Sequence, residues 1–406
     1  MDSIKNTSLG ELASQDSISN IFIFISDSLR FDHLPEWIRD RGLVAEAIAP
    51  STFTASSLPS MLTGQYPSEH GIHTFSDSLT KRPALFREAE NSGLSAETIW
   101  THLDSAEKPP LKMLNLEPSR PLKLLDQPFI YVEHDKGGHA PYGFSFEECS
   151  STREFYLNHV SGASEIPKLY QKSVDDSLAR FQKRLDYLES ENLFQDTLVI
   201  FASDHGELLG ESKYGNLYGH GSPIVPELVR VPLVFLGAQL PTGELDMLLS
   251  GCDIAPTALG AINSNPNKSM AGTNLWNEST IERQLRSEII HKLTIFNRVM
   301  SRYEATSIWD MDGGAVSQHG STLLRMAASM YLNYFSADSA GLSRSQIDVS
   351  SLWKFIKLFS ESNITYGSPG FDENDFDIPR VSHNRPAPKP TIDEETRQAL
   401  EDMGYR

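Results

Sequence analysis

The chain has 406 residues, 39% of them hydrophobic, which is enough for one large globular domain with a smaller part attached. Its 54 acidic and 35 basic side chains give a formal net charge of -19. A field of that sign repels nucleic acids and anionic lipids unless a local basic patch overrides it. We therefore expect no nucleic-acid partner, and the acidity suits solubility, including in high salt.

The cysteine content and the N-terminal sequence bear on the cellular location. The two cysteines, Cys149 and Cys252, exclude a disulfide framework and a cysteine-rich metal site. Residues 1–20 are polar and lack the basic and apolar regions of a signal peptide. No apolar run approaches the roughly 18 residues that are needed to cross a bilayer. We predict a soluble, cytoplasmic protein without a transmembrane segment.

Two apolar runs in the first third of the chain predict strands of a parallel sheet. Residues 21–25 and 128–133 are short, continuous and rich in β-branched or aromatic side chains, which is typical of strands buried on both faces. Asp27 follows the first run, and a glycine-rich loop with His139 follows the second. In open α/β sheets ligands bind at the carboxyl ends of strands, so both residues are candidates for a site.

Residues 51–64 are rich in small hydroxyl side chains. We predict a loop that enters a helix at about Thr54 to Ser57, because serine and threonine favour the N-cap position. We expect Pro67 and Gly71 to end this helix. The free N–H groups at its N-terminus would suit an anion.

The middle of the chain alternates between helix and strand patterns. Apolar residues recur at intervals of four and three from residue 170 to about 192, which predicts an amphipathic helix. Residues 197–203 predict the next buried strand, with Asp204 and His205 at its end, and residues 230–237 predict another. This alternation predicts an α/β fold with a doubly wound, mostly parallel sheet flanked by helices.

The pattern changes near residue 288, where aromatic-rich and less regular segments begin. We predict a catalytic α/β domain over residues 1–287 and a smaller C-terminal subdomain over residues 288–365. Residues 366–406 are rich in proline, aspartate and asparagine, so we expect an extended linker and a tail, with a short helix at 393–405.

Four polar residues at predicted strand and helix ends form one candidate metal site. Asp27, Thr54, Asp204 and His205 offer two carboxylates, a hydroxyl and an imidazole, a set that suits Zn²⁺ or Mn²⁺ best and Ca²⁺ or Mg²⁺ as alternatives. One divalent metal ion on Thr54 would lower the pKa of its hydroxyl and activate it as a nucleophile. Each residue alone is more often a cap or a turn residue, but their joint occurrence favours a shared site.

Two further histidines, His139 and His220, lie in glycine-rich surroundings, where we expect exposed rings. They would contact substrate phosphate, protonate the leaving group or bind a second metal. The alternative is an ordinary surface or structural histidine.

An ordered set of motifs between residue 21 and about residue 260 resembles the alkaline phosphatase superfamily, specifically its sulfatase-like branch. No single motif decides this, but they occur in the family's order. The matching stretches are residues 24–30, 62–71, 139–142, 203–207, 219–221, 230–233 and 253–257.

The residue in the nucleophile position departs from true sulfatases. Sulfatases carry a Cys/Ser-x-Pro-x-Arg signature, oxidised to formylglycine, nine residues before the threonine of Leu-Thr-Gly. Counting back from Thr63 leads to Thr54, which cannot give formylglycine. A second register at Ser57 has Pro59 but lacks the arginine, since Met61 stands there.

The local sequence around Thr54 looks more like the phosphoethanolamine transferases. This resemblance implies that Asp27, Thr54, Asp204 and His205 bind the metal and that two histidines lie near the substrate or a second metal. By the same resemblance these histidines are His139 and His220.

The resemblance also bears on the number of metals. Two-zinc members of the superfamily have an Asp-x-x-x-His pair, which is absent here because Ala179 follows Asp175 and Arg180 follows Asp176. A single metal ion is therefore expected.

We predict a metal-dependent phosphoester hydrolase or transferase in which Thr54 forms a covalent phospho-threonine. Arg30 would orient Asp27 or bind an anion, and the substrate would be a small-molecule, carbohydrate or lipid-headgroup ester. Two alternatives are a sulfatase acting on a sulfated carbohydrate or small ester, and a binding protein that keeps the fold without turnover.

Overall fold

The computed structural model describes residues 3–371 except 14–17, 102–108, 118, 145–147, 150, 265–267, 280–282 and 296–297. The predicted linker and tail lie almost entirely outside these residues, as does the predicted helix at 393–405. No helix in the described part of the chain combines the length and apolarity needed to cross a membrane. The cytoplasmic location stays a prediction.

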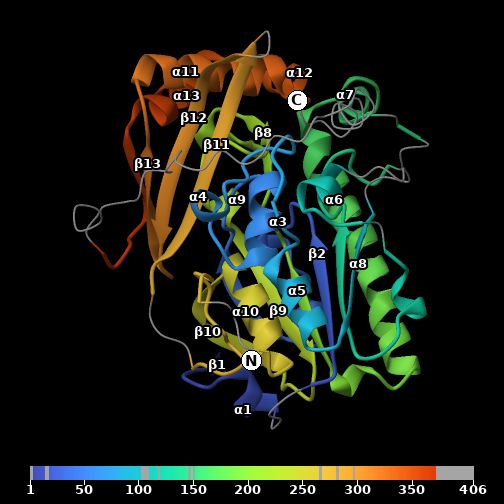
Figure 1. Ribbon diagram of the computed structural model, residues 1–406. Helices are drawn as coiled ribbons and strands as arrows, with labels where there is room; N and C mark the ends of the chain where they lie inside the picture. The colour runs from blue at the N-terminus through green and yellow to red at the C-terminus, as the bar shows by residue number, and fades with distance from the viewer. Residues whose placement is uncertain are drawn as a thin grey trace.

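A central eight-stranded mixed sheet forms the core of the molecule (Figure 1). Strand β9 runs antiparallel to both of its neighbours, and the remaining neighbours pair in parallel, which confirms the predicted mostly parallel α/β sheet. In spatial order the strands are β1 (Ser3–Ile4), β10 (Gly243–Ser250), β3 (Leu43–Ile48), β9 (Arg230–Gly237), β6 (Thr197–Ala202), β2 (Asn20–Ser26), β5 (Phe129–Asp135) and β4 (Ser95–Trp100).

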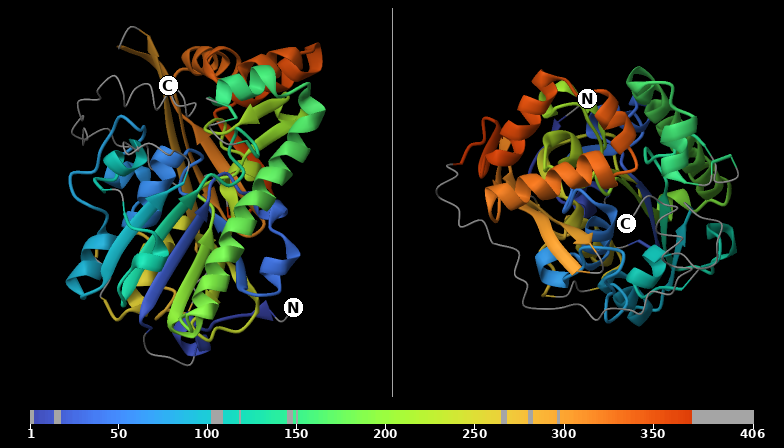
Figure 2. Two further views of the ribbon diagram at one scale, coloured as in Figure 1. Left: turned by 90° about the vertical axis from the view of Figure 1, so that its right-hand side faces the viewer. Right: turned by 90° about the horizontal axis from the view of Figure 1, so that it is seen from above.

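Helices cover both faces of this sheet, as Figure 2 shows for α8 (Ile166–Ser190) on one face. The side chains of β2 alternate between the two faces, because successive residues of a strand point to opposite sides. Phe22 and Phe24 lie on the face that α8 covers and pack in the same cluster as its apolar side chains. Ile21, Ile23 and Ile25 lie on the opposite face, in the second core cluster. The helices on the opposite face are α3 (Thr54–Thr63), α5 (Ala84–Asn91) and α10 (Ile254–Ala261).

Shorter elements connect these layers. They are α1 (Leu9–Ala13), α2 (Glu36–Arg39), α4 (Pro67–His70), α6 (Pro109–Met113), α7 (Thr152–Asn158), α9 (Pro226–Val229) and the hairpin of β7 (Leu208–Glu211) and β8 (Leu217–Gly219).

Helix α3 begins at Thr54, as the hydroxyl-rich sequence predicts, but it ends earlier than expected. Gly64 closes it in the left-handed conformation, with φ 70°, and its N–H bonds to the Ser60 carbonyl. Pro67 begins the separate helix α4, which Gly71 closes in the same way. The predicted end at Pro67 and Gly71 was therefore wrong.

A second, four-stranded antiparallel sheet forms the C-terminal part. Its strands, in order, are β11 (Leu285–Ile295), β12 (Arg298–Trp309), β13 (Gly313–Gln318) and β14 (Asn363–Gly367). Helices α11 (Thr322–Tyr331), α12 (Ala340–Ser345) and α13 (Val349–Ser360) follow β13. A separate smaller C-terminal subdomain is thus confirmed. The boundaries at 287 and 365 stay predictions, although β11 begins at Leu285 and β14 ends at Gly367.

One hydrophobic core joins the two sheets. Leu228 and Val229 from α9 pack in the same buried cluster as Tyr303, Trp309 and Phe355 of the C-terminal part. The C-terminal sheet is therefore packed against the region around β8 and α9.

Candidate metal centre and active site

The candidate site lies at the carboxyl edge of the two central strands. Strands β2 and β6 are parallel neighbours, with Ile25 opposite Ala202. Asp27 directly follows β2, and Asp204 comes two residues after β6. Because the strands are in register, both carboxylates reach the same place, and both are fully buried.

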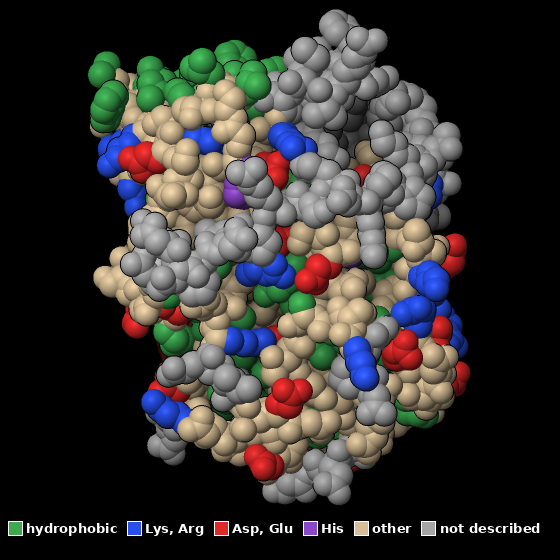
Figure 3. Space-filling view, turned by 60° about the vertical axis from the view of Figure 1, so that its left-hand side comes forward, with side chains coloured by type: hydrophobic (Ala, Val, Ile, Leu, Met, Phe, Trp, Pro, Cys, Tyr) green, Lys and Arg blue, Asp and Glu red, His purple; other side chains and the backbone are tan. Residues whose placement is uncertain are grey.

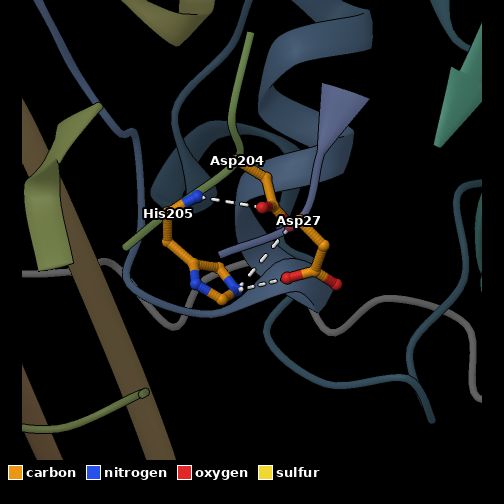
Figure 4. A group of neighbouring side chains, drawn as sticks. All are labelled: Asp27, Asp204 and His205. Carbon is orange, nitrogen blue, oxygen red and sulfur yellow. Dashed lines mark hydrogen bonds and ion pairs between the residues drawn. The ribbon is translucent and has the colours of Figure 1, made fainter. Parts of the chain in front are cut away.

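Three of the predicted ligands point toward one another (Figure 4). Their ligand atoms all lie within 4.8 Å of one another. His205 Nε2 is 3.7 Å from Asp27 Oδ1 and 3.7 Å from Asp204 Oδ2. Thr54 Oγ1 lies 2.9 Å from the same His205 nitrogen. The structure therefore brings together all four residues that the sequence predicts as one set, which we call the ligand cluster.

Neighbouring groups fix the orientation of His205 and Asp204. His205 Nδ1 donates to the carbonyl of Gly206 at 2.9 Å, so Nε2 carries the lone pair that faces the cluster. Asp204 Oδ1 accepts the backbone N–H groups of Ser28 at 3.2 Å and His205 at 3.0 Å. Asp204 Oδ2 lies 3.3 Å from His134 Nε2. These bonds hold the carboxylate and the imidazole in place before any ligand arrives.

The electrostatics of the cluster favour a cation. Burial, together with the charge of Asp204, raises the pKa of Asp27. Burial alone would also raise the pKa of Asp204, but His205 and the hydrogen bond from His134 lower it. Burial lowers the pKa of His205 to about 4. Two buried carboxylates beside a neutral imidazole and a hydroxyl form a donor set that fits a divalent cation such as Zn²⁺ or Mn²⁺.

The two hydroxyls that compete for the nucleophile position have different surroundings. Thr54 is the first residue of α3, and its hydroxyl faces the cluster. The Ser57 hydroxyl, one turn later, donates to the backbone carbonyl of Asp204 at 2.6 Å. Thr54 therefore has the placement that the nucleophile needs, while Ser57 is engaged in a structural bond.

His139 and His220 lie beside the cluster. The ring centroids of His220 and His205 are 4.5 Å apart, and those of His139 and His220 are 5.1 Å apart. His139 is buried, so the predicted exposed ring is wrong for this residue, and only 14% of the His220 side chain is exposed. Burial lowers the pKa of His139 to about 3 and that of His220 to about 4. Both rings are therefore neutral at pH 7.

Arg30 is turned to other partners than Asp27. Its guanidinium bonds Asp32 at 2.9 and 2.7 Å and Glu211 at 2.5 Å. Two carboxylates outside the cluster thus neutralise this cation, and the geometry gives no support to a role in orienting Asp27.

Sequence reasoning missed three residues at the site, one of which is His134, the partner of Asp204 Oδ2. Glu207 accepts hydrogen bonds from His220 Nδ1 at 2.9 Å and from the Tyr142 hydroxyl at 2.7 Å. The sequence could have indicated Glu207, because this residue ends the Ser-Asp-His-Gly-Glu motif that contains Asp204 and His205. His291 of β11 stacks on Phe53 with the ring centroids 6.0 Å apart, and Phe53 in turn stacks on His220 at 6.2 Å. No local sequence pattern indicates His291.

Comparisons with known proteins agree with this fold. The family model "Sulfatase" matches residues 111–264, and the model "Type I phosphodiesterase / nucleotide pyrophosphatase" matches residues 27–123. The Low-salt glycan biosynthesis sulfotransferase Agl7 of Haloferax volcanii is 40% identical over 365 residues, which is 89% of each chain. An uncharacterized sulfatase, YidJ of Escherichia coli, is 25% identical and covers 52% of this chain and 49% of its own.

Solved structures share the fold at lower identity. The phosphonate monoester hydrolase of Agrobacterium radiobacter superimposes with a TM-score of 0.57 at 14% identity, covering 84% of this chain and 96% of its own. A 2-O GAG sulfatase superimposes with a TM-score of 0.57 at 15% identity, covering 74% and 83%.

The fold and the family matches together define a protein of the alkaline phosphatase superfamily. Within that superfamily, the chain belongs to the sulfatase-like family of hydrolases and transferases.

Proposed function

We propose that this protein transfers a sulfuryl group from a sulfate ester to a carbohydrate hydroxyl, with Thr54 as the nucleophile. The observation that carries the proposal is the Thr54 hydroxyl, 2.9 Å from His205 Nε2 and beside two buried carboxylates. The carbohydrate acceptor and the choice of transfer rest on the relative that is 40% identical over 89% of the chain, a sulfotransferase of glycan biosynthesis.

The metal ligands in this proposal are Asp27, Thr54, Asp204 and His205. A divalent cation held by them would lower the pKa of the Thr54 hydroxyl and neutralise charge on the anionic ester. Zn²⁺ or Mn²⁺ fits the donor set best.

The reaction has two half-reactions. In the first, Thr54 Oγ1 forms a bond to sulfur, the bond between sulfur and the donor oxygen breaks, and the Thr54 proton ends on the departing oxygen. In the second, the acceptor oxygen forms a bond to the sulfur of the sulfo-threonine, the bond between sulfur and Thr54 Oγ1 breaks, and the acceptor proton, taken up first by His220, ends on Oγ1. His220 is neutral, and its Nδ1 is bonded to Glu207, so Nε2 takes the acceptor proton as general base.

Phosphoester chemistry through a phospho-threonine is a second candidate. The phosphodiesterase family model matches residues 27–123, a stretch that contains both Asp27 and Thr54. Sulfate and phosphate esters are both anionic tetrahedral groups, so the same cluster would serve either. Hydrolysis would differ from transfer only in the second half-reaction, where water replaces the acceptor alcohol.

Trapping the covalent intermediate separates these candidates. The purified protein is incubated with p-nitrophenyl sulfate or p-nitrophenyl phosphate and Mn²⁺, Zn²⁺ or Ca²⁺, then quenched in acid. Accurate-mass spectrometry of the peptide that contains Thr54 and Ser57 should show a sulfuryl group on Thr54, and none in Thr54→Ala. Thr54→Ser should retain part of the turnover, because serine keeps the hydroxyl.

Other results of the same experiment would select a different mechanism. A phosphoryl group alone would select the second candidate, and formylglycine at residue 57 would select the sulfatase route. Full turnover of Thr54→Ala with the metal still bound, measured by elemental analysis, would overturn the threonine mechanism. Chelation of the metal should abolish turnover, and Mn²⁺ or Zn²⁺ should restore it.

A further inference from the structure

Exposed apolar side chains gather on the C-terminal helices. Among the residues that the structure describes, eleven large hydrophobic side chains are exposed, and eight of these lie between residues 323 and 353. In Figure 3 hydrophobic side chains cluster at the end of the molecule that α11 covers. We call this set the apolar cap: Leu323, Leu324, Met330, Tyr331, Phe335, Ile347, Val349 and Trp353.

The cap is separate from the core beneath it. Helix α13 buries Phe355, Leu358 and Phe359 in the core that joins the two sheets. On the same helix Val349 is 88% exposed and Trp353 is 68% exposed. The helix thus has one apolar side in the core and further apolar residues in solvent. Clustered apolar side chains of this kind mark an interaction site rather than ordinary surface.

The charge of this region is opposite to that of the whole chain. Residues 322–360 contain four basic side chains, of which Arg325 is buried, and two acidic ones, so the three remaining cations leave a charge of about +1 at the surface, while the chain as a whole carries -19. Lys354 and Lys357 lie on the same helix as Trp353, and Lys357 is exposed. The region therefore lacks the acidic surplus of the rest of the chain, and the lysines of α13 can contact an anionic surface there.

The segment that carries the cap residues, from α11 to α13, is hydrogen-bonded to the loop that carries His220. Ser339, just before α12, donates its hydroxyl to the carbonyl of Tyr218 at 3.1 Å. The side chain of Asn333 lies 3.5 Å from the Ser222 hydroxyl. These contacts flank His220 on both sides, so the cap and the candidate site share one end of the molecule.

We propose that the apolar cap docks on a lipid membrane with anionic headgroups. Tryptophan and tyrosine favour the boundary between headgroups and acyl chains, leucine and valine insert below it, and lysine contacts lipid phosphate. The protein binds peripherally, and its candidate site then faces esters that are anchored in the membrane. This last consequence rests on the proposed function, whereas the docking itself does not.

A second copy of the chain fits the cap less well. A twofold contact through α13 would bring Lys354 and Lys357 of both copies close together. The cores of protein interfaces are depleted in lysine, because burying like charges is unfavourable. Lipid phosphates, in contrast, complement these cations.

Vesicle flotation tests the docking with the full chain. Vesicles of phosphatidylcholine with about one third phosphatidylglycerol should carry the protein upward in a density gradient, and phosphatidylcholine alone should carry much less. Trp353 provides a second readout, since Trp100, Trp276 and Trp309 are buried and Trp37 is partly buried against the core beside α8, outside the cap. The emission of the protein should shift to the blue on binding, and Trp353→Phe should remove most of that shift while flotation persists.

Variants connect the binding to the cap. Leu323→Glu with Val349→Glu should lower the partition coefficient by about tenfold or more, because two inserted side chains become charged. Leu124→Glu is the matched control, since Leu124 is 56% exposed and lies on η2 (Leu122–Leu124), outside the cap. All three positions are exposed, so circular dichroism and turnover of p-nitrophenyl esters should be unchanged.

Two results would overturn the proposal. One is the absence of flotation with anionic vesicles by a protein that is folded and monomeric. The other is a dimer in light scattering that the double glutamate variant converts to monomers. Neither result depends on Thr54 chemistry, so failure of the docking and failure of the proposed function remain distinguishable.

Discussion

Glu207 connects His220 to the interior of the protein. It is buried, accepts a hydrogen bond from the N–H of His220 Nδ1, and accepts another from the Tyr142 hydroxyl. A carboxylate in this position sets which ring nitrogen of His220 carries the proton, and hence which nitrogen faces the substrate.

Glu207→Gln should therefore reduce kcat by about 10- to 100-fold while KM and metal content change little. The amide cannot accept from both partners as the carboxylate does, so the ring of His220 loses its fixed orientation. Steady-state kinetics with p-nitrophenyl esters, together with elemental analysis, measures both quantities. Glu227→Gln is a matched control, because Glu227 also accepts a tyrosine hydroxyl, that of Tyr214, at 2.7 Å. Equal losses in the two variants would argue against a positioning role for Glu207.

The sequence identifies those site residues whose place follows from strand geometry. Asp27 and Asp204 could be predicted as neighbours because each follows a buried strand and parallel strands end at one edge. The partners of Arg30 could not be predicted, since several carboxylates lie within reach of a long side chain and only packing selects Asp32 and Glu211. His291 could not be predicted either, because the second sheet alone brings it to the site.

Helix α8 is tied to the central sheet by ion pairs as well as by its apolar side. Arg180 bonds both carboxylate oxygens of Asp135, at 2.6 and 2.7 Å, and Arg184 bonds both oxygens of Glu133. Both acids belong to β5 and are fully buried. Burial alone would raise the pKa of Asp135, but the hydrogen bond and the charge of Arg180 lower it.

Arg180→Met should lower the free energy of unfolding at pH 7 by about 2–4 kcal/mol, because it leaves a buried carboxylate without its cation. A lowered pKa in the folded state contributes stability above the unfolded pKa of about 3.9, and this contribution is lost as the pH falls through the folded pKa. The difference from the wild type should therefore be largest near neutral pH and should shrink below about pH 4. Urea denaturation at several pH values measures it.

Arg120→Met is the control for that experiment, since Arg120 pairs with Glu97 at 3.3 Å but is 49% exposed. It should change stability by less than about 1 kcal/mol. A pH-independent loss in Arg180→Met would mean that packing of the arginine stem, and not its charge, supports α8.

Elements of the central sheet were easier to predict than those of the second sheet. The apolar runs at β2, β5 and β6 are continuous, and the helix at α8 has a clear period. Residues 303–309 of β12 are all buried, and Tyr303, Ala305 and Trp309 lie in the core that joins the two sheets. Such a strand lacks the alternation of apolar and polar side chains that marks a half-exposed strand. For this reason the sequence pattern did not predict β12.

The whole molecule carries 54 acidic against 35 basic side chains. Repulsion among like charges destabilises a compact state, and dissolved salt screens it. The melting temperature should therefore rise by about 5 °C or more between roughly 0.05 and 1 M KCl at pH 7.

Two controls isolate the charge effect. Sorbitol at equal osmolality should raise the melting temperature much less, because it does not screen charge. At about pH 4.5, where carboxylates begin to take up protons, the effect of KCl should also be smaller. A melting temperature that is independent of KCl at pH 7 would show that the acidic side chains are spaced too widely to repel one another.

Leu228 and Val229 share a buried cluster with Tyr303 and Trp309. The stability of the C-terminal sheet is therefore coupled to that of the central part. Melting of the C-terminal sheet would expose the apolar side chains that α9 contributes to this cluster, so we expect the two parts to unfold together. We therefore expect heat, denaturant or a badly placed truncation that loosens the C-terminal sheet to disturb the candidate site around Thr54 as well, although Thr54 lies on α3 beside the central sheet.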